Sequence, residues 1–207
     1  MFSIVEAAGW PIWPLIACSI AALAIVFERL STLRGARVIP PTLLDEAIAV
    51  SGTALPSADI IDKLELNSAL GAVLAAGFRA VRRPHASAES VREDMENSGR
   101  AQMHRLGRYL NALGTLASIA PLLGLLGTVV GLIEIFGSQS GAGSNPILLA
   151  HGISVALYNT AFGLIIAVPS LLFYRYFRGR VDDFGIEMEQ AAIRLATHLH
   201  GHLGAAR

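Results

Sequence analysis

Residues 109–133 read YLNALGTLASIAPLLGLLGTVVGLI, a run of 25 residues without a charged side chain. A helix of about 20 apolar residues crosses the roughly 30 Å hydrocarbon core of a bilayer, so this stretch is long enough to span it. A second uncharged run covers residues 135–174, and Glu134 is the single formal charge between the two. Because the second run begins with turn-forming residues, GSQSGAGSNP at 137–146, we expect a helical hairpin that crosses the membrane and returns.

All 16 Lys and Arg residues lie outside this hairpin, in the blocks 29–108 and 175–207. Short segments rich in Lys and Arg stay cytoplasmic, so both blocks belong on the same side of the membrane. A third apolar stretch, residues 7–27, ends at Glu28-Arg29 and supplies the first span. The absence of Lys and Arg before it argues against a signal peptide and against lipoprotein processing at Cys18.

The predicted fold is an all-α integral membrane protein with three spans, its N-terminus outside and its C-terminus inside. A hydrophobic content of 53% excludes an ordinary soluble domain, and the lack of a long single-sign charge run disfavours nucleic-acid binding. We expect a short periplasmic N-terminus (1–10), a first span (11–28), a cytoplasmic helical domain (29–110), a second span (111–136), a periplasmic loop (137–147), a third span (148–174) and a cytoplasmic C-terminal helix and tail (175–207).

Helical signals fill the cytoplasmic segments. Thr42 is expected to cap one helix, Asn67 to cap another over Ser68–Arg83, and Ser87 with Ser90 to open a third. No proline interrupts residues 85–120, so we expect the third helix to run straight into the second span. The apolar stripe over Arg178–Leu199 likewise extends the third span into the cytoplasm. Helices this long need packing partners, which predicts self-association.

Small residues mark both arms of the hairpin. In the second span, Gly127 and Gly131 form a GxxxG pair, and Gly124 with Thr128 forms a second small pair. In the third span, small residues recur at helical spacing: Ala156, Thr160, Gly163 and Ala167. Pro121 and Pro169 are the expected sites of altered packing or a kink. These patterns predict a close approach of helices inside the membrane.

The segments 120–131 and 152–169 together closely resemble the ExbB/TolQ/MotA proton-channel family, nearest to its ExbB and TolQ branches. The resemblance implies a bacterial inner-membrane ring of five copies around a pair of single-span partners of the ExbD/TolR type. It implies that the second and third spans line a pore, in which protons pass between a partner aspartate and the hydroxyls of Thr128 and Thr160. The alternative for both threonines is a bond to their own helix in a small-residue interface.

An ExbB-like subunit would use the proton motive force to energise a TonB-type protein for transport at the outer membrane. Two alternatives stay open: a TolQ-like subunit serving envelope integrity, and a ring that holds partner helices without conducting protons. One departure bears on this choice, because family members often carry Glu-Ala-Leu in the third span where this chain reads Val155-Ala-Leu. Candidate replacement relays are Glu134, His151 and Asn159; the last two share a stripe with Val155.

Two surface clusters are ambiguous by sequence. His198, His200 and His202 either bind a metal or belong to a frayed tail, and Arg79, Arg82 and Arg83 either meet anionic lipid or are ordinary solvated charges. We find no Walker loop, nucleophile–base pair or metal cluster in the sequence. The sequence therefore predicts neither an enzyme nor a cofactor.

Overall fold

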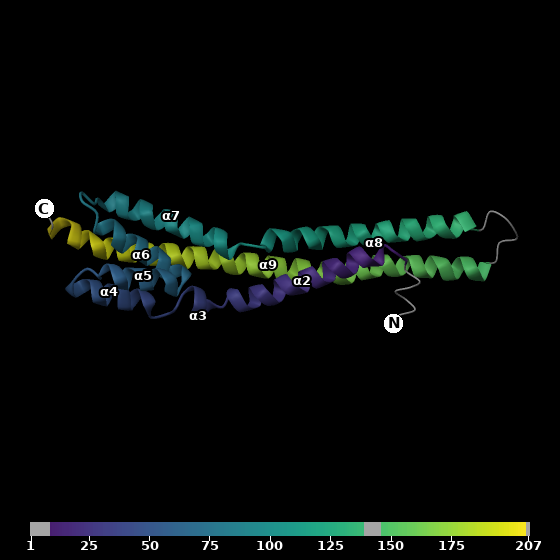
Figure 1. Cartoon of the computed structure of the whole chain (residues 1–207), viewed down its shortest axis with the longest axis horizontal. Coiled ribbons are helices and arrows are strands. Elements are labelled where there is room, and N and C mark those ends of the chain that lie inside the picture. The colour runs from purple at the N-terminus through teal and green to yellow at the C-terminus, as the bar shows by residue number, and fades with distance from the viewer. Residues whose placement is uncertain (1–8, 139–145, 206–207) are drawn as a thin grey trace. The chain divides into compact units, whose positions relative to one another are not determined.

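The computed structural model describes residues 9–138 and 146–205, and nearly all of them are helical (Figure 1). The described part of the chain contains no strand. The helices are α2 (Ile12–Thr32), α3 (Gly35–Val38), α4 (Leu43–Thr53), α5 (Ala58–Asn67), α6 (Ala69–Val81), α7 (Ala88–Leu106), α8 (Leu110–Ser138) and α9 (Pro146–Ala205). The all-α prediction is confirmed.

Three segments are long and apolar enough to cross a membrane: Ile12–Thr32, Ala88–Gly137 and Gly152–Gly201. The three-span prediction is therefore confirmed, and the chain is a multi-pass membrane protein. The chain divides into two compact units. One contains the residues up to Glu28 together with Tyr109–Tyr176, and the other contains Arg29–Arg108 together with Phe177–Arg207.

The expected single helix through residues 85–120 is wrong in one respect. Helix α7 ends at Leu106 and α8 begins at Leu110, with Tyr109 in the left-handed region at φ 64°. The guanidinium of Arg29, only 3% exposed, donates to the Leu106 carbonyl at 2.8 Å. In a continuous helix that oxygen would accept from the amide of Leu110, so the arginine caps α7 at the point where Gly107 weakens the helix.

In the second unit, the predicted helix starts are partly right. Ser87 and Ser90 form the reciprocal capping box at the start of α7, as expected. Helix α6, however, is capped by Ser68 rather than Asn67, because the Ser68 hydroxyl accepts the Gly71 amide at 3.0 Å. Asn67 instead ends α5, a helix that the sequence reasoning did not find. Thr42 precedes α4 without a side-chain capping bond.

The core of the second unit is built from apolar stripes. Helix α6 is buried on almost every side and contacts both α5 and α7. The expected stripe on α9 is fully buried: Val181, Phe184, Met188, Ala191 and Leu195. The buried stripe packs the part of α9 that follows the apolar span into the core of the second unit, as the periodicity of the sequence predicted.

Candidate functional site

The second and third spans, α8 and α9, pack antiparallel through small residues. As residue numbers rise along α8 they fall along α9, so that Gly114 lies against Tyr174, Gly124 against Asn159 and Thr160, and Gly131 against Ala156. A β-carbon placed on Gly124 would lie 2.6 Å from the Asn159 carbonyl oxygen. Only glycine fits at that separation. The GxxxG surface is therefore occupied by the neighbouring span of the same chain.

The first span completes the core of this unit. Leu15 of α2 is buried with Ala120 of α8 and Ala167 of α9, and Leu123 and Ile166 pack against this cluster. Gly163 contributes a second close approach, since a β-carbon there would lie 2.6 Å from the Ala120 carbonyl oxygen. Helix α2 thus covers one flank of the α8–α9 pair.

Thr128 is buried, with 7% of its surface exposed. Its hydroxyl donates to the Leu125 carbonyl of its own helix at 2.6 Å. The proton of this hydroxyl is therefore engaged, while its oxygen keeps lone pairs that can accept a further hydrogen bond.

Thr160 differs from Thr128 in the hydrogen bonding of its hydroxyl. Its oxygen is buried, yet it has no hydrogen-bond partner among the residues that the structure describes. A buried hydroxyl left without a partner costs about 1–3 kcal/mol, so native structures normally supply one, from protein or from water. The Thr160 hydroxyl is therefore a polar group between α8 and α9 that can bind a partner other than the described residues of the chain.

Both threonines turn away from the first span. At about 100° per residue, Thr128 lies about 140° around α8 from Leu123, and Thr160 lies about 120° around α9 from Ile166. Leu123 and Ile166 pack against the cluster that contains Leu15 of α2, and Glu134 of α8 and Asn159 of α9 line a cavity with Pro11, which precedes α2. Thr128 lies about 120° around α8 from Glu134, and Thr160 lies about 100° around α9 from Asn159. The two hydroxyls consequently lie on the flank of the α8–α9 pair that α2 does not cover.

Glu134 lies at a separate cavity of about 250 Å³ on the α2 flank. Pro11, which precedes α2, lines the cavity, as do Val155 and Asn159 of α9. Glu134 itself is exposed, whereas Asn159 is 1% exposed. The structure thus brings Glu134 together with Val155 and Asn159, and separates it from the threonine flank by about 120° around α8.

The remaining residues singled out by the sequence have simpler positions. Pro121 and Pro169 lie inside α8 and α9, and neither ends its helix. The side chain of His151 lies outside the residues that the structure describes, as does that of His202. Within the described residues, no group of three His, Cys, Asp or Glu side chains is arranged to hold a metal ion.

The arginines considered as a lipid patch are engaged within the protein. Arg79 pairs with Glu65 and Asp62, and these hydrogen bonds, that of Glu65 first, raise the pKa of its guanidinium. Arg83 pairs with Asp94, and Arg82 donates to the Pro56 carbonyl at 2.8 Å. These contacts hold α5, α6 and α7 together.

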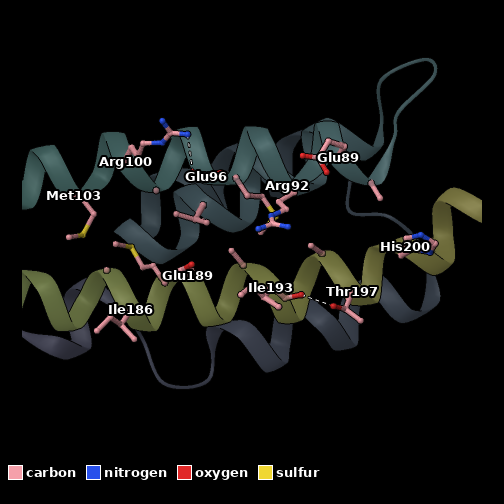
Figure 2. Close-up of a pocket in the computed structure, with 18 of the residues that line it drawn as sticks. Glu89, Arg92, Glu96, Arg100, Met103, Ile186, Glu189, Ile193, Thr197 and His200 are labelled. Atoms are coloured by element: carbon pink, nitrogen blue, oxygen red, sulfur yellow. Dashed lines mark hydrogen bonds and ion pairs between the residues drawn. The ribbon is translucent and has the colours of Figure 1, made fainter.

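A groove of about 1130 Å³ runs between α7 and α9 in the second unit (Figure 2). Its walls combine small and apolar residues with charges of both signs, including Arg92, Glu96 and Glu189. Arg100 pairs with Glu96 along α7 at its edge, as the dashed line in Figure 2 shows. Sequence reasoning missed both this groove and the Glu134 cavity, because each joins segments that are distant in the chain.

The chain is similar in sequence to a known protein family and to several known proteins. Residues 65–190 match the family described as MotA/TolQ/ExbB proton channel family. The chain is 34% identical over 166 residues to biopolymer transport protein exbB1 of Vibrio cholerae, covering 79% of this chain and 72% of that protein. It is 30% identical over 181 residues to a putative ExbB-like protein 3 of Synechocystis, covering 86% and 85%. The Tol-Pal system protein TolQ of Haemophilus influenzae is 30% identical over 118 residues, covering 56% and 52%.

Proposed function

Because the chain belongs to the MotA/TolQ/ExbB proton channel family, we propose that it is an ExbB-like motor subunit of the bacterial inner membrane. In this proposal, five copies form a ring around a single-span partner of the ExbD type, and proton flow energises a TonB-type protein. The similarity to proteins named for biopolymer transport, over most of their length, supports this branch. The observation that carries the proposal is the buried hydroxyl of Thr160, which has no hydrogen-bond partner among the described residues.

The two threonines would act differently toward a partner carboxylate. The Thr160 hydroxyl, which lacks a partner among the described residues, can donate to a carboxylate or hold a relay water. Thr128 has its proton on the Leu125 carbonyl and would act as an acceptor. Neither adds a second charge to a dry pore, where charge is expensive. Each proton that crosses supplies about 2.3 kcal/mol per 100 mV.

Glu134 would supply the carboxylate that Val155 cannot. Both residues line the same cavity, with Asn159 in the wall between the spans. The acid would then reach this cavity from α8 rather than from the position in α9 where the family often carries glutamate. In this arrangement Glu134 takes up or releases protons at the α2 flank, and the threonines serve the opposite flank.

The threonine roles are tested by proton uptake into vesicles that contain the ring with an ExbD-type partner. Thr160→Val removes the hydroxyl at nearly constant volume, and Thr160→Ser restores it. We expect uptake to fall at least ten-fold in the valine variant and to recover in the serine variant. Thr115→Val is the matched control, because Thr115 is exposed on α8 and bonds only its own helix, at 2.8 Å to the Asn111 carbonyl. Equal uptake in Thr160→Val and Thr115→Val would contradict the proposal.

The Glu134 role is tested in the same vesicles. Glu134→Gln should leave ring assembly intact and reduce uptake, and the double variant Glu134→Gln, Val155→Glu should recover it by returning a carboxylate to the same cavity. Unchanged uptake in Glu134→Gln would remove Glu134 from the mechanism.

Two other functions have an observation in their favour. The TolQ of Haemophilus influenzae supports a TolQ-like role in envelope integrity, and co-purification with a TonB-type or a Tol-type third protein separates the two branches. The bond from Thr128 to its own helix supports a scaffold ring that conducts no protons. Partner-dependent proton flux in the unmodified protein excludes the scaffold.

A further inference from the structure

Three arginines in the second unit form no ion pair with any acid that the structure describes. We name Arg34, Arg37 and Arg180 the arginine patch. Arg34 precedes α3 and Arg37 lies one turn later, and both are exposed. Gly35, between them, brings α3 onto α9, because a β-carbon there would lie 3.5 Å from a terminal guanidinium nitrogen of Arg180. The contact thereby brings Arg180 to the short segment that carries Arg34 and Arg37 on either side of Gly35.

The patch is not neutralised by the chain. No ion pair is formed by its three members within the described residues, whereas the neighbouring Arg178 pairs with Asp182 at 3.6 Å. No acidic residue occurs between Arg29 and Leu44, and on α9 the first acids beyond the span are Asp182 and Asp183, which follow the arginines. This contrasts with Arg79 and Arg83, whose charges are matched by pairs inside the unit.

The geometry of Arg180 favours binding of a planar or tetrahedral oxyanion. Its guanidinium lies over the ring of Phe184, 4.7 Å from the ring centre, and Phe184 is itself 1% exposed. Contact with a buried ring restricts the motion of the guanidinium, and its several N–H donors suit it to bind an oxyanion. An arginine held in this way loses little entropy when it binds phosphate oxygens in the bidentate manner.

The position of the patch along the chain identifies the source of that phosphate. Arg34 follows Phe27, the last residue of the first uncharged run, by seven residues, and Arg180 follows Tyr174, the last residue of the third, by six. Six helical residues rise about 9 Å. The headgroup layer on each side of the hydrocarbon core is about 5–8 Å deep, and an arginine side chain can reach back over the remaining distance.

We propose that the arginine patch is a binding site for the phosphate headgroup of an anionic phospholipid. Its function would be to fix the depth of the first and third spans, since one headgroup would tie α3 to α9 at the membrane surface. The proposal is independent of the proton-channel role and concerns the lipid rather than the pore.

The test measures phosphatidylglycerol binding to the full-length protein in neutral detergent, by native mass spectrometry, with phosphatidylcholine as the uncharged reference. Removing an arginine near an anionic lipid weakens binding about five-fold, so Arg180→Gln should lose about five-fold and Arg34→Gln, Arg37→Gln about 25-fold. The charge-matched control is Arg92→Gln, Arg100→Gln on α7, where Arg100 makes only an exposed pair with Glu96. This control should bind phosphatidylglycerol as the unmodified protein does.

Three results would overturn the proposal. The first is equal binding in the patch variants and in the unmodified protein. The second is an equal loss in the α7 control, which would show a general charge effect. The third is displacement of the lipid by millimolar inorganic phosphate, which would indicate a site for a free anion. Arg34→Lys, Arg37→Lys keeps the charges and should retain most of the binding, so that misfolding of the glutamine variants is distinguishable from loss of the site.

Discussion

Adding one methyl group at successive glycines of α8 should change the stability of the protein in an order set by how closely each glycine approaches α9. The four substitutions are Gly124→Ala, Gly127→Ala, Gly131→Ala and Gly137→Ala. The chemical change is the same in each case, and all four positions lie in one helix. Differences between the variants therefore report the space that each position offers to the added β-carbon.

The structure gives the size of each clash. The new β-carbon would lie 2.6 Å from the Asn159 backbone oxygen at Gly124, 2.7 Å from the Asn159 β-carbon at Gly127, and 3.1 Å from the Ala156 β-carbon at Gly131. Ordinary contact begins at 3.4 Å, so the first two fall short by about 0.8 and 0.7 Å and the third by about 0.3 Å. A β-carbon at Gly137 would have no atom of another described segment within 4 Å.

Two opposing free energies then decide the outcome. Gly→Ala in a helix gains about 1 kcal/mol in helix propensity, while overpacking a tight interface costs about 1–3 kcal/mol. Gly137→Ala should therefore be neutral or stabilising by up to about 1 kcal/mol. Gly131→Ala should be near neutral, because a few tenths of an ångström can be absorbed. Gly124→Ala should be the most destabilising, since the atom it meets is backbone and has no rotamer to escape into.

The assay is reversible unfolding in mixed micelles of mild detergent and SDS, followed by far-ultraviolet circular dichroism. Gly137 lies in the last turn of α8, so subtracting the Gly137→Ala result removes part of the propensity gain, and the order of the three interior variants then reports the packing cost. The Gly127 clash is with the side chain of Asn159, whose nearest atom is its β-carbon, so Asn159→Gly should reduce the cost of Gly127→Ala in a double-mutant cycle and leave that of Gly124→Ala, which meets the Asn159 backbone oxygen, unchanged. Equal stability of Gly124→Ala and Gly137→Ala would refute the α8–α9 contact.

Two further predictions concern the join between α7 and α8. Arg29→Gln removes a charged donor from the Leu106 carbonyl and should lower the free energy of unfolding by about 1.5–3 kcal/mol. The control, Arg100→Gln on the exposed face of α7, should change it by under about 0.5 kcal/mol in the same assay. A loss for Arg29→Gln no larger than that of the control would contradict the capping role. The Tyr109→Gly protein should be more stable to unfolding than the Tyr109→Ala protein by about 1 kcal/mol, because only glycine adopts positive φ without strain. The reverse order would show that Tyr109 is not held in that conformation.

The helices and spans were predictable from the sequence to a large degree. The uncharged runs, the arginine blocks and the capping box at Ser87 and Ser90 are local signals, and each corresponds to an element of the structure. One error arose where a distant residue contributes to the outcome. Gly107 alone does not end a helix, and the break after Leu106 depends on a bond from Arg29, 77 residues away.

The candidate site shows the same limit. The threonines, glycines and Glu134 were identifiable as residues with a role inside the membrane, because polar and small side chains are unusual in an apolar span. Which of them share a cavity was not identifiable, since this depends on the antiparallel register of α8 against α9 and on the position of Pro11. The same register leaves the Thr160 hydroxyl unbonded within the described residues while Thr128 bonds its own helix.

The order of residues by itself determined that this chain crosses a bilayer three times with helices, because the bilayer demands about 20 uncharged residues and internally satisfied backbones wherever a chain passes. Only the tertiary structure decided which flank of the hairpin α2 covers, which hydroxyl stays available, and which arginines stand unpaired beside α3. Those outcomes depend on side-chain contacts between segments far apart in the chain, and helical periodicity constrains the face of each helix but not the partner that meets it.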